Sequence, residues 1–303
     1  MSRLVTRDFL EATFTGFKSL YDKSFAAADP LYPKIATVVE STTDKETYNW
    51  LGSVPAMREW VDERLPGALR THDYEIANRK YEATIEVDRA TFEDDRLGQV
   101  KPRIEELAVR AATHPDELAC ALLNDGFTAA CYDGQYFFDT DHSEGSSGSQ
   151  SNKLTSALGT ASLESAVTTM MQFRDDQGRP LGVMPNALLV GPDSFFTARE
   201  ILNSVSIVLA GSTDVEKPGG NPLSGMLDLL VSPHIDAGKW FVLATSYPVR
   251  PLLFQWRIKP EFTAVTDPSD EYVFSTDAFK YGVRSRCGAG YGLWYLAVGS
   301  TGA

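Results

Sequence analysis

Asp139, Asp141 and His142 are the densest group of potentially catalytic side chains, in the run Asp139-Thr140-Asp141-His142. Two carboxylates and an imidazole within four residues are ligand types that can hold a divalent metal ion. One hypothesis is therefore a metal-dependent hydrolase that uses Asp139, Asp141 and His142. The competing interpretation is a polar loop after a short strand at 136–138, in which the aspartates accept turn hydrogen bonds. We favour the loop, because the sequence shows no second cluster of ligands.

Motifs for other enzymatic chemistries are missing. Gly145-Ser146-Ser147-Gly148 does not match the GxSxG elbow of serine hydrolases. It lies in the polar run SEGSSGSQSNK at 143–153, whose composition predicts a flexible loop and a domain boundary. A GxxxxGK[ST] phosphate loop, an HExxH helix and a strand-linked GxGxxG are absent. We therefore predict a protein that is not an enzyme and has no catalytic residues, no bound metal and no cofactor.

Composition limits the function further. The chain has 303 residues, of which 43% are hydrophobic, enough for a substantial core and about two domains. Its net charge of −13 argues against tight binding of nucleic acid, but a container for DNA would tolerate an acidic wall.

The sequence has no secretory signal and no membrane-length apolar run, so we expect synthesis in a cytoplasm. Its three cysteines, without CxxC spacing, predict reduced and partly buried thiols.

The first half of the sequence predicts two long helices. Residues 6–25 have aromatic and aliphatic side chains at spacings of three and four, with Thr6 as N-cap. Their shared apolar face consists of Leu10, Phe14, Phe17, Tyr21 and Phe25. Such a face needs a partner surface in its own chain or in a neighbour. Residues 98–125 predict a rod of roughly 40 Å at about 1.5 Å per residue, in which Pro115 starts a second helix or kinks the first.

Residues 80–88 show the clearest strand pattern. Tyr81, Ala83, Ile85 and Val87 alternate with polar residues, which gives one apolar and one charged face. A strand inside a parallel sheet is apolar on both faces, so this one cannot be central there. We predict an exposed two-stranded arm that lays its apolar face on another surface.

The remaining pattern predicts a compact α/β unit followed by strands. Residues around Trp50, Val54, Met57 and Val61 fit a short helix. Further helices are expected at 162–174 and 193–203, with strands at 35–39, 187–190 and 227–231. The closing strands are expected at 240–245, 251–258, 271–275, 279–286 and 291–298. The glycines at 282, 288, 290 and 292 indicate bulges or a close approach of another backbone.

Several long segments resemble the major head subunit (T protein) of Mu-like phages and prophages. In order, they are YEIANRKYEATIEVDRATFEDDRLGQVKPRIEELA, HPDELACALLNDGF, YDGQYFFDTDH, PNALLVGP, NPLSG and DAFKYGVRSRCGAGYGLWYLAVGS. The similarity covers nearly the whole chain. It implies an α+β protein with the Hong Kong 97-like fold of tailed-phage capsids. The implied function is a major capsid protein that assembles an icosahedral shell around double-stranded DNA.

The resemblance also implies a division of the chain. The expected parts are an N-terminal arm at 1–45, an extended β-hairpin or E-loop at 46–96, a peripheral domain with a spine helix at 97–142, an axial domain at 143–248, and closing strands of the peripheral domain at 249–303. The candidate inter-subunit contacts are Tyr81, Ile85, Val87, Phe14, Phe17, Glu86 and Arg89. Charges in this region could pair with a neighbour and fix its register.

The partners that the resemblance implies are other copies of the chain, in pentamers and hexamers, together with a head protease and a portal. The lack of a long N-terminal extension implies a separate scaffold protein. No Lys–Asn cross-link site can be matched, so we expect non-covalent assembly. Contact with packaged DNA should be weak and non-specific, and no membrane is involved. The expected location is the virion, after assembly in the bacterial host cytoplasm. A tail tube subunit is the alternative among virion proteins.

Overall fold

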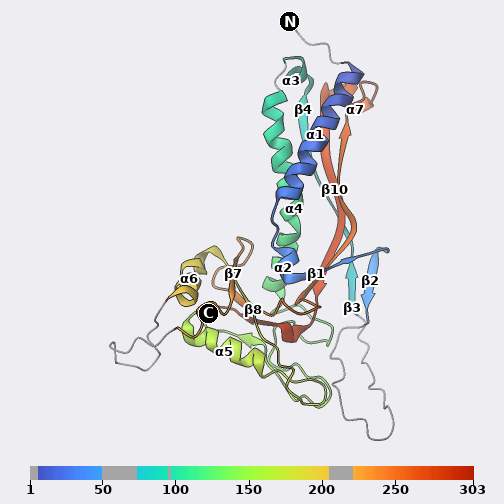
Figure 1. Ribbon diagram of the computed structural model, residues 1–303. Coiled ribbons are helices and arrows are strands. Elements are labelled where there is room, and N and C mark those ends of the chain that lie inside the picture. The colour runs from blue at the N-terminus through green and yellow to red at the C-terminus, as the bar shows by residue number, and fades with distance from the viewer. Residues whose placement is uncertain (1–5, 50–73, 95–96, 205–220) are drawn as a thin grey trace.

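Figure 1 shows the computed structural model, which describes residues 6–49, 74–94, 97–204 and 221–303. An elongated part contains two long helices, α1 (Arg7–Ala27) and α4 (Leu97–Asp125), beside a four-stranded sheet. A wider part contains a five-stranded sheet with the shorter helices α5 (Thr160–Met171) and α6 (Phe195–Asn203). The predicted short helix around Trp50 to Val61, and most of the predicted hairpin, lie outside the described residues. Among the described helices, none is both long and apolar enough to span a membrane.

The two predicted long helices are present. In α1 the Thr6 side chain accepts a hydrogen bond from the Phe9 amide, as expected of its N-cap residue. Helix α4 runs through both Pro102 and Pro115 without interruption. The predicted second helix start at Pro115 is therefore not seen. Pro115 is buried, and helix packing on both sides outweighs the one backbone hydrogen bond that proline removes.

The four-stranded sheet has the order β1-β9-β10-β4. Its strands are β1 (Ala36–Glu40), β9 (Leu252–Val265), β10 (Ala278–Tyr291) and β4 (Arg79–Asp88). Strand β4 pairs antiparallel with β10 over its whole length, from Asp88 opposite Ala278 to Arg79 opposite Cys287. The predicted strand at 80–88 is thus present, but its predicted place in an exposed arm is wrong. It is an edge strand of the sheet, whose apolar face packs within its own chain, and short α3 (Arg89–Glu93) follows it.

A separate two-stranded sheet pairs β2 (Lys45–Tyr48) with β3 (Tyr74–Ala77). It packs on β10 at Gly288 and Gly290, which lack side chains. A Cβ atom on Gly288 would lie 2.6 Å from the Ala77 carbonyl oxygen, and one on Gly290 would lie 2.4 Å from the Ile76 Cδ1 atom. The predicted close backbone approach is confirmed at Gly288, whereas Gly290 is approached by side-chain atoms. Within the predicted 46–96 segment, the described strands belong to two sheets, because β2 and β3 form this small sheet and β4 belongs to the larger one.

The five-stranded sheet has the order β5-β11-β8-β6-β7. Its strands are β5 (Lys153–Leu154), β11 (Ala297–Ser300), β8 (Trp240–Leu243), β6 (Ala187–Val190) and β7 (Asp228–Val231). The predicted strands at 187–190 and 227–231 are confirmed. Strand β11 comes from the segment predicted to close the other domain, so the 249–303 segment is divided as well. The chain crosses between the sheets at the short helix η2 (Trp294–Leu296).

The predicted strand at 271–275 is wrong. These residues form helix α7 (Glu271–Thr276), which begins where the Asp270 side chain accepts a hydrogen bond from the Tyr272 amide. It ends at Asp277, which adopts a left-handed conformation with φ of 52°. The run Tyr272-Val273-Phe274 is apolar enough to resemble a strand, but only Val273 of the three is buried. Local capping decides the structure here.

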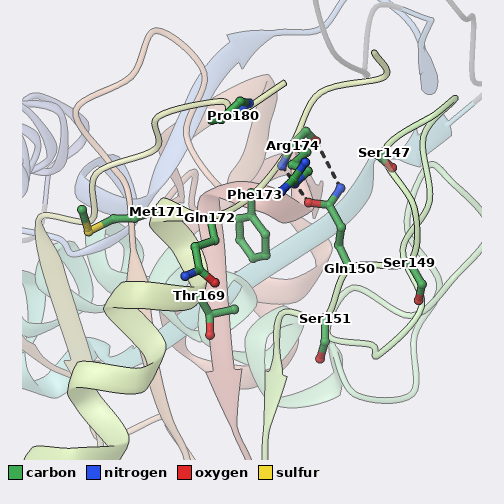
Figure 2. A pocket seen from close by; sticks show the side chains of 10 residues that line it. All are labelled: Ser147, Ser149, Gln150, Ser151, Thr169, Met171, Gln172, Phe173, Arg174 and Pro180. Atoms are coloured by element: carbon green, nitrogen blue, oxygen red, sulfur yellow. Dashed lines mark hydrogen bonds between the residues drawn. The ribbon is translucent and has the colours of Figure 1, made fainter. Parts of the chain in front are cut away.

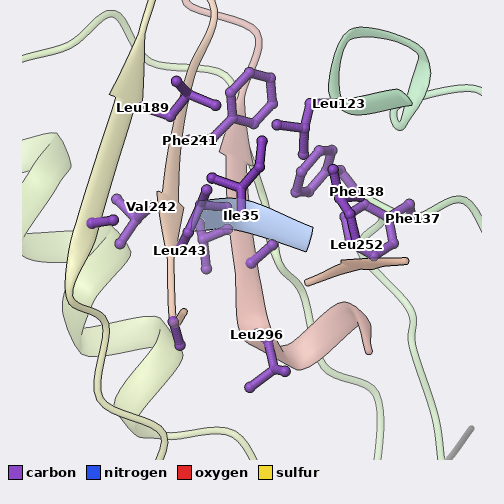
Figure 3. Close-up of a cluster of buried hydrophobic side chains, with 14 of the residues drawn as sticks. Ile35, Leu123, Phe137, Phe138, Leu189, Phe241, Val242, Leu243, Leu252 and Leu296 are labelled. Atoms are coloured by element: carbon purple, nitrogen blue, oxygen red, sulfur yellow. The ribbon is translucent and has the colours of Figure 1, made fainter. Parts of the chain in front are cut away.

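The apolar side chains form two cores. The larger core lies around the five-stranded sheet and the lower half of α4, and Figure 3 shows part of it, including Leu123, Phe138, Phe241 and Leu252. The second core fills the space between α1, the upper half of α4 and the long strands β9 and β10. Its aromatic contacts include Phe17 with Tyr281 at 5.2 Å and Tyr21 with Phe262 at 5.0 Å between ring centres. The aromatic face of α1 is thus covered by its own chain.

We expect Gly288→Ala to destabilise the protein by about 1–3 kcal/mol, because a methyl group would collide with backbone of β3 that cannot move aside alone. Gly16→Ala is the matched control. Gly16 lies inside α1 with no atom within 4 Å of its would-be Cβ, so alanine should stabilise the helix by about 0.5–1 kcal/mol. Urea unfolding of the two variants measures both changes. Equal stability of the Gly288→Ala variant and the parent would contradict the proposed contact.

Candidate functional site

The structure does not assemble the predicted metal ligands Asp139, Asp141 and His142. The carboxylate of Asp139 accepts hydrogen bonds from the amides of Thr140 at 2.8 Å and Tyr136 at 3.2 Å. Asp141 is exposed, whereas His142 is completely buried. Asp139 therefore does what the turn interpretation predicts, and the metal hypothesis loses its ligand set because His142 is bonded elsewhere. In place of the predicted strand at 136–138, a single β-bridge joins Ala130 to Tyr136.

His142 instead meets two residues that sequence reasoning missed. Its Nδ1 atom lies 2.6 Å from Asp133 Oδ2, and its ring stacks on Trp294 at 4.2 Å between ring centres. The other oxygen, Asp133 Oδ1, accepts from the Gln135 amide and lies 3.0 Å from Cys131 Sγ. A tight turn with Gly134 at φ of 87° places Cys131 and Asp133 together. The local signal was the Asp133-Gly134 pair, which is typical of turns.

The carboxyl of Asp133 is only 5% exposed. Burial alone would raise its pKa, but hydrogen bonds from His142 and Cys131 outweigh burial and hold the pKa below its usual value. The buried Cys131 thiol has a raised pKa, chiefly through desolvation and secondly through the nearby Asp133 charge. A thiol held in its protonated form is a poor nucleophile and a poor metal ligand. Within the described residues, Cys131, Asp133 and His142 are the one group with metal-ligand spacing, and they hydrogen-bond to one another.

A second polar network lies on the other side of Trp294. The buried Glu144 carboxylate accepts from the Tyr132 hydroxyl at 2.6 Å and from Trp294 Nε1 at 3.3 Å. Asn152, also buried, donates to the carbonyls of Phe137, Trp294 and Ala297. The run at 143–153, predicted as a flexible loop, is therefore tied into the core. The composition of this run suggested flexibility, but its polar side chains form hydrogen bonds with buried backbone groups. Leaving those backbone groups unpaired would cost more free energy.

A hollow of the wider part lies beside this run and is shown in Figure 2. It has a volume of about 550 Å³ and lies between the polar run and the end of α5. One wall is fixed by Gln150, whose side chain donates to the Arg174 carbonyl and accepts from the Arg174 amide. Its lining side chains are Ser147, Ser149, Gln150, Ser151, Thr169, Met171, Gln172, Phe173, Arg174 and Pro180. That lining includes no carboxylate, histidine or cysteine to act as acid, base or nucleophile.

The predicted inter-subunit contact residues fall into two groups. Phe17 and Val87 are buried in the second core, and Phe14 stacks on Phe262 at 5.8 Å between ring centres. Phe17 and Val87 are covered within one chain, whereas Phe14 is half-buried, and contact of these residues with a neighbour stays a prediction. Tyr81 and Ile85 are half-buried, and Glu86 is exposed. Arg89 lies 3.5 Å from both Glu93 and Asp277.

Two exposed aromatic side chains were missed by the sequence patterns. Phe274 on α7 is 86% exposed, and Phe196 on α6 is 77% exposed. Helix α7 lies at the tip of the elongated part and helix α6 at one side of the wider part in Figure 1. A single exposed ring does not by itself define a contact surface. The two rings are nevertheless the most exposed large apolar side chains among the described residues.

This architecture defines the class of the protein. The chain is similar to the subunit in the procapsid of bacteriophage JBD30, with a TM-score of 0.62 and 32% identity over 98% of this chain and 76% of that chain. The long helix beside a sheet, joined to a compact five-stranded unit, is the Hong Kong 97-like fold of tailed-phage capsids. The chain is a structural capsid subunit, and the class is not an enzyme.

The family follows from the sequence comparisons. The model of the Mu-like prophage major head subunit gpT matches residues 10–161, 153–235 and 236–303, and the chain belongs to this family. The Mu-like prophage FluMu major head subunit of Haemophilus influenzae is 33% identical over 293 residues, which are 97% of this chain and 73% of that protein. The major capsid protein of Escherichia phage Mu is 33% identical over 299 residues, 99% of this chain and 75% of that protein.

We expect His142→Phe to destabilise the fold by about 1–3 kcal/mol. The phenyl ring keeps the stacking on Trp294 but leaves the buried Asp133 carboxylate without its histidine donor. Asp141→Asn, on the exposed neighbour, should change stability by less than about 0.5 kcal/mol. Urea unfolding at neutral pH measures both variants.

The pH dependence gives a further check on the same variants. Because the folded pKa of Asp133 is lowered, its contribution to stability is full above the ordinary carboxyl pKa of about 3.9. That contribution is lost as the pH falls through the lower folded value. His142→Phe removes the largest cause of the lowering, so the difference between variant and parent should shrink on acidification. A difference that stays constant from pH 7 to strongly acidic pH would contradict this role.

Proposed function

We propose that the chain assembles into pentamers and hexamers of a closed icosahedral shell that encloses double-stranded DNA. The observation that carries the proposal is the match over nearly the whole chain to the gpT family, together with the similarity to a procapsid subunit. The geometry supports it, because the chain has a long rigid part and a compact part, each ending in an exposed aromatic side chain. A subunit that touches several neighbours at once needs contact surface at separate ends.

We also propose that β2 and β3, at the start of and within the 46–96 segment, form the base of the family's E-loop. Their pairing places Tyr48 opposite Tyr74, and the glycines of β10 let this pair lie against the long sheet. The Tyr48 hydroxyl donates to Gln255 at 2.8 Å, and the Tyr74 hydroxyl accepts from the Tyr291 amide at 3.0 Å. These contacts hold the two strands on the long sheet. We likewise propose a peripheral domain at 97–142 and an axial domain at 143–248. Strand β4 then belongs with the four-stranded sheet and β11 with the five-stranded sheet.

The proposed partners follow from family membership. A separate scaffold protein would set the curvature of the shell, a head protease would mature it, and a portal would occupy one vertex. The DNA inside would touch the shell weakly, because a subunit with net charge −13 repels a polyanion. Assembly would take place in the bacterial host cytoplasm, before the shell becomes part of the virion. The three buried cysteines carry no disulfide, which suits a reducing compartment.

Expression of the full chain together with the scaffold protein of its own phage tests this function. We expect closed, icosahedral particles by electron microscopy, sedimenting far ahead of the free subunit. Open tubes would favour a tail tube subunit instead. Well-folded subunits that stay monomeric at high concentration with scaffold present would overturn the proposal.

A further inference from the structure

Strand β4 leaves one edge of the four-stranded sheet unpaired. It pairs with β10 on one side only, in ten consecutive pairs without a register shift. Within the described residues, no other strand pairs with its second side. An edge of this length exposes a row of backbone N–H and C=O groups that can accept another strand. Soluble proteins usually block such edges with charged side chains, proline, a bulge or a very short strand, and of these β4 has only the charged side chains.

The sequence of β4 is complementary to itself in antiparallel orientation. If two copies pair about a twofold axis at Ala83, Lys80 of each lies opposite Glu86 of the other. In the same register Tyr81 lies opposite Ile85, Glu82 opposite Thr84, and Ala83 opposite its own copy. Opposite charges and aromatic–aliphatic pairs are the cross-strand combinations that stabilise a sheet. The small residue Ala83 lies on the axis, where the two chains would approach each other.

Competing registers are less favourable. A slip by one residue places charged side chains opposite apolar ones, because successive residues point to opposite faces. A twofold axis at Glu82 places two copies of Glu82 opposite each other. An axis at Thr84 places Glu82 opposite Glu86. Like charges directly opposite each other destabilise strand pairing, so of these registers only the one centred on Ala83 avoids a penalty.

Two charged side chains of β4, Lys80 and Glu86, lack an ion-pair partner among the residues that the structure describes. Lys80 lies opposite Arg286 of β10, which is a pairing of like charges. Glu86 lies opposite Lys280, whose Nζ atom is placed over the ring of Tyr272 at 3.3 Å. Neither Lys80 nor Glu86 forms an ion pair with a described residue. A second copy would supply the carboxylate that Lys80 lacks and the ammonium group that Glu86 lacks.

A crevice of about 250 Å³ lies between β4 and α4, on the helical side of the sheet. Its lining includes both apolar and charged side chains, among them Tyr81, Ala83, Ala111, Val283, Glu82, Arg110 and Glu117. A twofold axis perpendicular to the sheet brings both helices α4 to the same face. The half-buried side chains of Tyr81 and Ile85 in one copy would then lie beside those of Ile85 and Tyr81 in the other.

We propose that β4 is a twofold contact between two copies of this chain, paired antiparallel in the register centred on Ala83. The contact joins two four-stranded sheets into one continuous sheet. It rests on the proposed function as a shell subunit, and it specifies which surface and which residues connect neighbouring subunits. Such an isologous contact uses the same patch on both partners, which is the condition that self-complementarity of β4 fulfils.

Charge reversal tests the register. Lys80→Glu and Glu86→Lys each create two like-charge pairs across the contact, one on either side of the axis, and each should lower the yield of shells about tenfold in co-expression with scaffold. The double exchange Lys80→Glu with Glu86→Lys restores opposite charges and should restore the yield. The control exchanges Lys259 and Glu40, an exposed pair 3.4 Å apart at the other edge of the same sheet, and should leave the yield unchanged. Single variants that assemble as well as the parent would overturn the proposal.

A cysteine on the axis gives a direct geometric readout. In Ala83→Cys the two sulfur-bearing residues would face each other with Cα atoms about 4.5–5.5 Å apart, within disulfide range. Oxidation of assembled shells with diamide should therefore give covalent dimers. In Thr84→Cys the two positions would be about 8 Å apart and should not cross-link. The native thiols are buried and should not contribute.

The two proposals fail in different ways. Ala83→Cys shells that form normally but give no covalent dimer would overturn the twofold contact and leave the shell function intact. Absence of shells from the unaltered chain would overturn the shell function itself. Equal cross-linking of Ala83→Cys and Thr84→Cys would show pairing in another register, which also contradicts the contact proposed.

Discussion

Strand β10 is the element on which the rest of the structure depends. Its first half, around Phe279 and Tyr281, is buried in the core between α1 and α4. Its second half ends at Cys287 and Tyr291, in the core of the five-stranded unit. The same strand pairs with β9 along one edge and β4 along the other. Because one continuous backbone is shared by both cores, the elongated and the wider parts cannot move independently without breaking this strand.

The glycines of β10 extend this constraint to the base of the arm. Gly288 and Gly290 lie where β3 crosses the strand, and side chains there would hold β3 away from the sheet. The register shifts in β9–β10 pairing fall just before them, between Arg284 and Cys287. An irregular pairing followed by residues without side chains lets a second small sheet rest on the first. The position of β2 and β3 on the long sheet is therefore set by backbone geometry, not by exposed side chains.

The sequence patterns predicted elements better than their partners. Period two at 80–88 and period 3.6 at 6–25 located β4 and α1 closely, because both depend on residues near in sequence. Neither pattern could show that the apolar faces of β4 and α1 meet in one core, since that core is completed by β9 and β10 nearly two hundred residues later. The short apolar run at Tyr272 to Phe274 was misread as a strand for a related reason. The deciding feature was a capping hydrogen bond from the Tyr272 amide to Asp270.

The polar residues were harder to predict than the apolar ones. The 143–153 run has the composition of a linker, yet Glu144 and Asn152 are buried and bonded to Trp294. Burial of a polar side chain is favourable only when each partner is in place, and the partners here lie about 150 residues away. His142 was singled out by its two aspartate neighbours, but its actual partner, Asp133, belongs to a separate turn. The residues adjacent in sequence thus drew attention to His142, but they predicted the wrong interaction partners for it.

The division of the surface follows from the same physics. Side chains that complete the two cores are conspicuous in sequence but are no longer available to a neighbour, as Phe17 and Val87 show. The groups left for assembly are those that the single chain cannot satisfy. Among the described residues, such groups include the exposed rings of Phe196 and Phe274 and the open edge of β4 with Lys80 and Glu86. A shell subunit must fold alone before it assembles, so its contacts have to be made from such remaining groups. The edge strand suits this order, because its backbone groups can be solvated by water in the free subunit and bonded to another strand in the shell.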